Sequence, residues 1–336
     1  MKTKRFIFLV IALCCAVLAK AQNNESPTAI LQHVVEGTET VKVYVGKEAF
    51  KNAYTDAVNG DVITLSSGSF TVPSAFQKEL SVYGAGYEED AESGTAVTTL
   101  SGTIEIKDIE SLSNLHFEGL RINGDITFRV PVSKMVISKC YISQHVYLYG
   151  TLSKDITIEQ SVIGLGVGGY NFSEYITKAE NLRVKNCILS GVSIFDPSST
   201  VQIDHCLIFG QTNNDRDYVY PFVYTNCIFG KYKYRVYVVG TLEYCILPLG
   251  DAIHYSNLRY PDKVFSDSDD GWADSYSPDR TYTLLLPGEW IGSDGTEIGI
   301  HGGMGFSKVP STPVIKNMTV TPVGTKIKVN YETNVR

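Results

Sequence analysis

Apolar and polar residues alternate along much of the chain in short segments that repeat. Between residues 115 and 247, alternating apolar positions are followed by two polar residues, a small residue and two further apolar residues. Alternation with a period of two and many β-branched residues is typical of strands rather than helices. The pattern therefore predicts pairs of short strands joined by a tight polar bend.

The small position of these segments forms a column that consists mostly of cysteine. Successive segments place there Leu120, Cys140, Ser161, Cys187, Cys206, Cys227 and Cys245. The steps run from 18 to 26 residues, and such a period predicts a solenoid whose coils each contribute one repeat. The preceding position holds Gly119, Lys139, Gln160, Asn186, His205, Asn226 and Tyr244. Asparagine tolerates a left-handed bend there, and we expect it to hydrogen-bond to its neighbours in the stack.

The two ends of the repeat region carry different patterns. Residues 22–40 are polar and are predicted to be a loose lead-in, and residues 41–45 are a first strand. Residues 48–58 place Ala49, Phe50, Ala53, Tyr54 and Ala57 on one face of a helix. We expect coils over about residues 61–265 and a closing segment over about 266–336. Together these make one all-β parallel β-helix domain over residues 41–336.

Several stretches resemble right-handed parallel β-helix proteins of the pectin-lyase-like superfamily. At the start, the helix is followed by Gly60-Asp-Val-Ile-Thr-Leu65 and by Leu80-Ser-Val-Tyr-Gly84. Near the end, Asp294-Gly-Thr-Glu-Ile-Gly-Ile-His-Gly-Gly303 resembles the closing segment of secreted β-helix proteins of Bacteroidetes type. The resemblance implies a short capping helix, a right-handed coil and a closing segment. It implies little about activity, because lyases, hydrolases and non-enzymes share this fold.

The first 21 residues have the features of a secretory signal peptide. Lys2, Lys4 and Arg5 precede the apolar stretch 6–18, and Ala19 and Ala21 suit cleavage before Gln22. A membrane anchor and a lipoprotein are alternatives, but the apolar stretch is short for a span and Leu13 precedes Cys14. We therefore expect a secreted protein, periplasmic or extracellular, with no membrane span in the mature chain.

Composition narrows the possible partners. The 336 residues are 43% hydrophobic and 19% charged, with a net charge of −7. Residues 1–21 carry four basic residues and no acid, so the remaining chain stands at −11. This sign argues against a nucleic-acid partner, because phosphate binding needs basic residues. Five cysteines remain in residues 22–336, none of them in a C-x-x-C pair, and we expect buried free thiols.

Motifs for metal binding and catalysis are weak. The acidic stretch from Asp267 to Asp274 allows a Ca²⁺ site, although a solvated loop fits its spacing better and no metal ligands are assigned. His205 is interpreted as part of the stack, and His301 as structural. Arg129-Val-Pro131 is a partial match to the lyase pattern of the superfamily but lacks its companions.

The strand that follows each bend carries aromatic residues at alternate positions. If Val146, Leu148, Val192, Ile194, Val219, Val236 and Val238 point inward, their neighbours form an outward row next to charged residues. The predicted binding residues are Tyr147, Tyr149, Phe195, Tyr218, Tyr220, Tyr237, Arg216 and Lys233. Exposed aromatic rings in a line suit stacking on sugars, whereas an ordinary tyrosine-rich strand face covered by loops is the alternative.

Two functional hypotheses follow from this row. The first is a secreted protein that binds a polysaccharide or glycan. The second is a polysaccharide lyase or inverting glycoside hydrolase acting on an acidic polysaccharide, with Asp196, Asp217 and Arg235 as candidate catalytic residues. A further expectation concerns the apolar position after the cysteine column. Residues 311–336 are predicted to cover this stripe, which would otherwise be bare.

Overall fold

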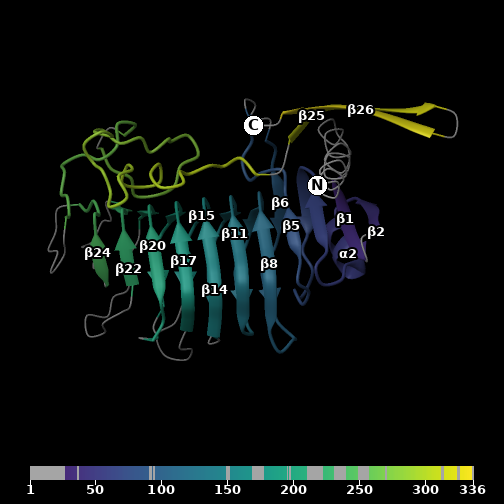
Figure 1. Ribbon diagram of the computed structural model, residues 1–336, viewed down its shortest axis with the longest axis horizontal. Coiled ribbons are helices and arrows are strands. Elements are labelled where there is room, and N and C mark those ends of the chain that lie inside the picture. Colours follow the sequence, from purple (N-terminus) through teal and green to yellow (C-terminus); the bar gives the residue numbers. More distant parts are fainter. Residues whose placement is uncertain are drawn as a thin grey trace.

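The computed structural model describes residues 27–35, 38–90, 93, 95–148, 152–168, 178–194, 196, 198–209, 222–230, 240–248, 257–268, 271–311, 314–323 and 326–334. Their backbone forms a parallel β-solenoid of about seven turns, so the expected all-β architecture is confirmed (Figure 1). Along the stack, like strands of successive coils lie side by side in parallel register, for example Met135 opposite Leu115 and Ile156.

Three sheets form the walls of the solenoid. The first is eleven-stranded and runs in the order β2 (Thr38–Val45), β1 (Thr28–Val35), β3 (Val62–Leu65), β5 (Ser81–Tyr83), β8 (Leu112–Glu118), β11 (Val132–Ser138), β14 (Leu152–Glu159), β17 (Lys178–Lys185), β20 (Val201–Asp204), β22 (Phe222–Thr225) and β24 (Thr241–Glu243). The second is eight-stranded: β23 (Ile228–Phe229), β21 (Leu207–Ile208), β18 (Ile188–Leu189), β15 (Val162–Ile163), β12 (Tyr141–Ile142), β9 (Arg121–Asn123), β6 (Thr98–Ser101) and β4 (Gly68–Thr71). The third has five strands: β19 (Val192–Ser193), β16 (Gly166–Gly168), β13 (His145–Leu148), β10 (Ile126–Phe128) and β7 (Ile104–Ile106).

The N-terminal end is closed by helix α2 (Ala49–Asp56), which agrees with the predicted helix to within two residues. Its apolar face is buried, and the Tyr54 ring lies 4.8 Å from that of Phe76, a residue of the solenoid core. One prediction is wrong here. The supposed lead-in contains β1, because Ala29 and Leu31 alternate inward and pair with Leu65 and Ile63 of β3. At the other end of the chain, β25 (Val314–Val323) and β26 (Lys326–Asn334) form a two-stranded sheet of their own.

The cysteine column lies inside the solenoid, as predicted. Cys140, Cys187, Cys206, Cys227 and Cys245 are fully buried free thiols. Burial raises the pKa of Cys140 to about 12, so its reactive thiolate is disfavoured. The thiols therefore act as small apolar filler between the first and second sheets.

The residue before each column position makes the bend between these two sheets. From Gly119 to Tyr244 all seven predicted bend residues have φ between +47° and +69°, so the left-handed conformation is confirmed. A second column of left-handed residues, which sequence analysis missed, interrupts the strands of the first sheet at Asn114, Lys134, Asp155 and Asn181. There Asn181 Nδ2 donates to Asp155 Oδ1 of the preceding coil at 2.6 Å.

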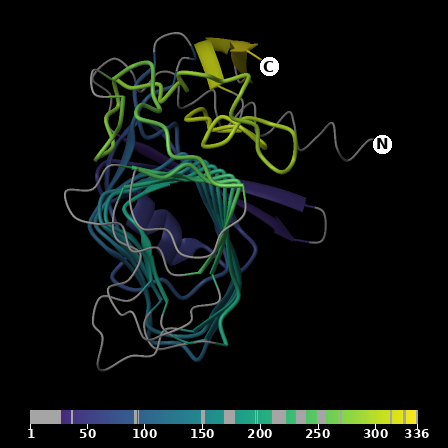
Figure 2. The same cartoon turned by 90° about the vertical axis from the view of Figure 1, so that its left-hand side faces the viewer.

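The apolar stripe after the cysteine column is covered, but by a different part of the chain than expected. Val162, Ile188, Leu207, Ile228 and Ile246 are buried in one cluster with residues between positions 264 and 306. These covering residues are Val264, Phe265, Trp272, Ala273, Tyr282, Leu284, Trp290, Ile298 and Ile300. The cover thus comes from upstream of residues 311–336. Figure 2 looks along the stack and shows the green-to-yellow closing segment along one side of the coils.

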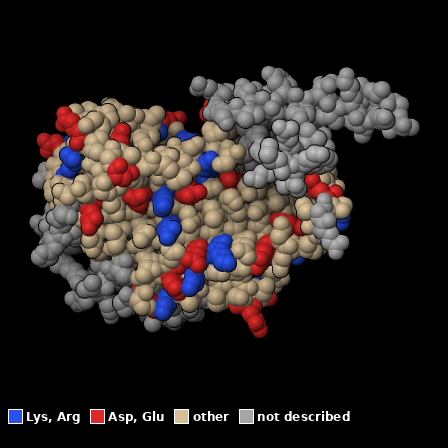
Figure 3. Space-filling model, in the orientation of Figure 1, with Lys and Arg blue, Asp and Glu red and all other residues tan. Residues whose placement is uncertain are grey.

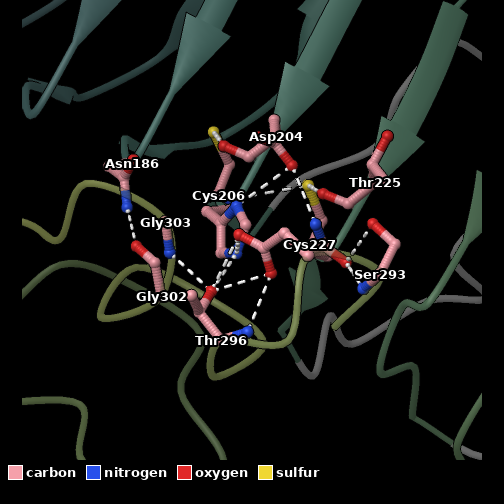
Figure 4. A network of polar contacts seen from close by, with 12 residues as sticks. Asn186, Asp204, Cys206, Thr225, Cys227, Ser293, Thr296, Gly302 and Gly303 are labelled. Atoms are coloured by element: carbon pink, nitrogen blue, oxygen red, sulfur yellow. Dashed lines mark hydrogen bonds and ion pairs between the residues drawn. The ribbon is translucent and has the colours of Figure 1, made fainter. Parts of the chain in front are cut away.

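Side chains of the bend column hold the closing segment in place (Figure 4). Asn226 Oδ1 accepts a hydrogen bond from Ser293 N at 2.8 Å, and Asn186 Nδ2 donates to Gly302 O at 2.7 Å. Between them, His205 Nε2 lies 3.1 Å from Thr296 Oγ1. The expected bond to a stacked neighbour is present at Asn226, whose Nδ2 donates to Asp204 Oδ1 of the preceding coil at 3.1 Å. The amides and the imidazole of the bend column also satisfy polar groups of the covering segment, which was not expected.

The contacts follow the coils in reverse order, so the closing segment runs back along the stack. Beyond Asn186, Gln160 Nε2 donates to Gly305 O at 2.6 Å and Lys139 Nζ to Ser311 Oγ at 2.7 Å. A Cβ atom at Gly302 would lie 2.5 Å from His205 Cδ2, so only glycine fits this position. The bend column is therefore both the turn of every coil and the docking line of the closing segment.

Replacing Asn226 separates these two roles. Asn226→Gly keeps the left-handed bend but removes the bonds to Ser293, and we expect a loss of about 1–2 kcal/mol in the free energy of unfolding. Asn226→Ala adds the strain of a left-handed alanine, about 1 kcal/mol more. Urea unfolding of both variants measures the difference. Equal stability of the two variants would contradict a left-handed requirement at this position.

Candidate functional site

Of the predicted site residues, Tyr147 and Asp196 lie in the described part of the chain. The others fall outside the described residues: Tyr149, Phe195, Arg216, Asp217, Tyr218, Tyr220, Lys233, Arg235 and Tyr237. Asp196 accepts hydrogen bonds from Ser198 N at 2.7 Å and from Ser198 Oγ at 2.5 Å. These bonds lower the pKa of Asp196 and tie its carboxylate into a local turn.

Tyr147 projects from the outer face of the third sheet. Its neighbours Val146 and Leu148 are fully buried, and Val192 and Ile194, on and just after β19, are buried in the same core. Because side chains alternate across a strand, Tyr147 points away from the core, and it is half-buried. Its ring is stacked on that of His145, with centroids 4.4 Å apart and an angle of 26° between the planes.

The row that contains Tyr147 continues in register through Thr127 and Glu105 toward the N-terminus. Toward the C-terminus it continues through Gly168 and Ser193, so the predicted aromatic row is interrupted on these two coils. Thr127 of β10 lies directly opposite Tyr147, and Glu105 of β7 lies opposite Thr127. The three residues therefore form a line with steps of one strand spacing, about 4.8 Å. Arg129 Nε donates to Glu105 Oε1 at 3.0 Å, and Lys107 forms an ion pair with the same carboxylate. The bond from Lys107, followed by that from Arg129, lowers the pKa of Glu105.

A second carboxylate lies beside the histidine of the stacked pair. Asp125 Oδ1 accepts a hydrogen bond from His145 N at 2.9 Å and lies 3.4 Å from His145 Nδ1. Burial lowers the pKa of His145, while the charge of Asp125 opposes that shift. The imidazole is therefore held neutral near pH 7, next to a tyrosine ring and within the same array as an arginine.

The outer face of the first sheet offers less for ligand binding. Figure 3 shows acidic and basic residues interspersed over this face. Some of them pair directly, such as Lys154 Nζ with Glu180 Oε1 at 2.9 Å, and others lie opposite in register, such as Glu159 and Lys185. Such alternation leaves no large patch of one sign on the described part of this face. We therefore assign the candidate site to the third sheet.

Sequence analysis missed Glu105, Lys107, Asp125 and Arg129 as members of this site. The alternation Ile104-Glu-Ile-Lys107 and Ile126-Thr-Phe-Arg129 carries the signal, since it continues the row of Tyr147 two coils upstream. The outward positions of these two coils hold no aromatic residue, so the aromatic pattern does not include them. Arg129 was noted only for the proline two positions later.

The described residues form neither a metal-binding cluster nor a membrane-spanning helix. Among the described residues no group of three or more histidine, cysteine or acidic side chains is placed to hold a metal ion. Asp267 of the acidic stretch accepts hydrogen bonds from Thr281 N and Tyr282 N, which makes it part of a loop, while Asp269 and Asp270 lie outside the described residues. No helix in the described ranges is long and apolar enough to cross a membrane.

Comparisons of the chain with protein-family models, with curated proteins and with solved structures found no significant match. The function of this site is therefore inferred from its geometry. That geometry combines a stacked His145–Tyr147 pair with two carboxylates and two basic groups on three adjacent coils.

Replacing Asp125 tests the electrostatics of the site. We expect Asp125→Asn to lower the pKa of His145 further, because the carboxylate that attracts the proton is lost. In the fold His145 binds its proton less tightly than in the unfolded chain, so its contribution to stability is complete above the usual pKa of 6.5 and falls as the pH drops below it. Titration of the His145 ring by NMR measures the shift. An unchanged or raised pKa would show that Asp125 does not act on the imidazole.

Proposed function

We propose that the protein is a secreted β-solenoid that binds a polysaccharide along the outer face of its third sheet. The observation that carries the proposal is the half-buried Tyr147 ring on the outer face, which lies in register two coils from Glu105, with the buried Thr127 between them. Rings of a sugar chain recur about every 5 Å, close to the spacing of adjacent strands. A linear glycan laid along the stack would thus meet equivalent positions on successive coils.

The chemistry of the row suits a carbohydrate. The Tyr147 ring offers apolar area to the C–H groups of a pyranose, and its stacking on His145 pre-orients it. Glu105 and Arg129 supply an acceptor and donors for sugar hydroxyls, whereas Thr127 between them is buried. Aromatic anchors with few rotatable bonds lose little entropy on binding.

Charge bears on the kind of sugar. In the described part of the face, the charges of Glu105 and Asp125 balance those of Lys107 and Arg129. This part therefore favours neither an anionic nor a cationic sugar. Arg216, Lys233 and Arg235 lie outside the described residues but follow the same repeat in sequence, and in a chain otherwise at −11 they favour an anionic glycan such as a uronate. The leader-like residues 1–21 support an extracellular location, and the resemblance to the pectin-lyase-like superfamily supports a glycan partner.

A second candidate function is polysaccharide cleavage by a lyase at the same face, favoured by the Asp125–His145 pair. An imidazole whose pKa is lowered by burial and that lies next to a carboxylate can accept a proton, and Arg129 can neutralise a uronate carboxylate. Incubation with uronate polysaccharides, followed by ultraviolet absorbance of unsaturated ends, tests this activity. It should vanish in His145→Ala, and its absence in the wild-type protein leaves binding without cleavage.

Removing the Tyr147 ring should weaken binding without unfolding the protein. We expect Tyr147→Ala to lower affinity for the bound glycan about tenfold, or about 1.4 kcal/mol, because the stacking surface is lost. Tyr260→Ala is the matched control, since Tyr260 is an exposed tyrosine outside the third sheet. A glycan array identifies the ligand, calorimetry measures the affinity, and a thermal melt monitors folding.

Two results would contradict the proposal. The first is unchanged binding by a folded Tyr147→Ala variant, which would place the site elsewhere. The second is an equal loss in Tyr147→Ala and Tyr260→Ala, which would indicate nonspecific contact with surface aromatic residues.

A further inference from the structure

Strand β2 leaves one edge of the first sheet unpaired among the described residues. It is the terminal strand of that sheet, and each of its residues from Thr38 to Val45 faces a residue of β1 on the other side. Figure 2 shows the purple β1–β2 hairpin projecting beyond the outline of the coils. The outer backbone N–H and C=O groups of an edge strand are a template for a further strand.

On one face of the hairpin four valines are exposed, although Ile30 and Thr28 of β1 on the same face are buried. Val41, Val43 and Val45 are 43%, 49% and 66% exposed, and Val34 of β1, on the same face, is 64% exposed. The opposite face is occupied, because Lys42 Nζ and Tyr44 OH both bind Asp56 Oδ2 of helix α2. The valines therefore face away from the helix, on the same strand that carries the open edge.

The usual protection of an edge strand is missing from β2. Such strands are commonly short, bulged, interrupted by proline or studded with charges. Strand β2 is eight residues long, pairs with β1 without a register shift and contains no proline. Its two charged residues are Glu39 and Lys42, and Lys42 is already paired with Asp56. A long β-branched strand of this kind favours pairing.

We infer that β2 pairs in antiparallel fashion with β2 of a second copy of this chain, giving a two-fold dimer with one continuous sheet. A second copy fits this edge because the side chains of β2 are complementary to those of an antiparallel β2. A two-fold axis at Val43 sets Val43 opposite Val43, Val41 opposite Val45, and Lys42 opposite Tyr44. The valine faces of both copies then lie on the same side of the joined sheet, and no like charges are opposed.

Registers shifted toward the N-terminal end of β2 are worse, and an axis at Tyr44, which sets Val43 opposite Val45, is the alternative that the cross-linking below distinguishes. An axis at Lys42 sets two ammonium groups opposite each other, and an axis at Val41 sets Glu39 against Val43. An axis between two residues would turn the valines of the two copies to opposite faces of the sheet. Because a single strand pair buries little area, the dimer is reversible and depends on concentration.

Cysteine cross-linking of the full chain tests both the dimer and its register. Val43→Cys should form a covalent dimer under mild oxidation, at least tenfold faster than Val34→Cys, which is similarly exposed but lies on β1. Val41→Cys and Val45→Cys should each remain monomeric alone and cross-link to each other when mixed. The five native thiols from Cys140 to Cys245 do not interfere, because they are buried, and every variant also carries Cys14→Ser and Cys15→Ser.

Sedimentation equilibrium supplies the measurement without cysteine. The mean mass of the wild-type protein should rise with concentration, and Val43→Lys should abolish the rise by opposing two ammonium groups, while Val34→Lys should not. The inference is overturned if the wild-type protein stays monomeric and Val43→Cys cross-links no faster than Val34→Cys. It is also overturned if the thiol introduced by Val43→Cys is shielded from a thiol reagent in a monomer, since another part of the same chain would then cover β2.

Discussion

The left-handed bend between the first and second sheets is the constraint on which the rest of this solenoid depends. Each coil from Gly119 to Tyr244 turns from the first sheet into the second through a single residue with positive φ. A left-handed conformation costs most residue types free energy, and stacking on neighbouring coils must compensate that cost. Once the bend is set, the cysteine beside it faces the core and the next two residues enter the second sheet.

The same bend explains how the closing segment finds its place. Residues at the bend project their side chains outward at a regular spacing, and the outward amides of Asn186 and Asn226 meet backbone groups of residues 293–302. The apolar stripe of the second sheet supplies the burial, as Trp290 and Ile298 pack on Ile228 and its neighbours. Polar contacts thus fix the register of a cover whose stability comes mainly from apolar area.

The repeating features of the coils could be predicted from the sequence, whereas the features outside the repeat could not. The column from Leu120 to Cys245 could be aligned because every one of these coils needs the same two kinds of residue. One faces the core, and the residue before it adopts a left-handed conformation. The partners of Asn226 and His205 could not be predicted, because Ser293 and Thr296 lie in a segment without a repeat. Strand β1 was missed for a related reason. It pairs with β3 in antiparallel fashion and so follows neither the period nor the direction of the coils.

The second sheet and the β1–β2 hairpin differ in whether their apolar residues are covered. On the second sheet the stripe from Val162 to Ile246 is buried under more than one aromatic ring of the closing segment. On the β1–β2 hairpin four valines stay exposed, although the same chain satisfies Lys42 and Tyr44 of β2 with a single carboxylate. A cover that follows the bend column ends at Gly119 and Pro310, where a Cβ atom at Gly119 would lie 2.8 Å from the proline ring. Strands β1 and β2 precede Gly119, the first of these bends. The closing segment, which follows the bends and covers the second sheet, therefore does not reach them.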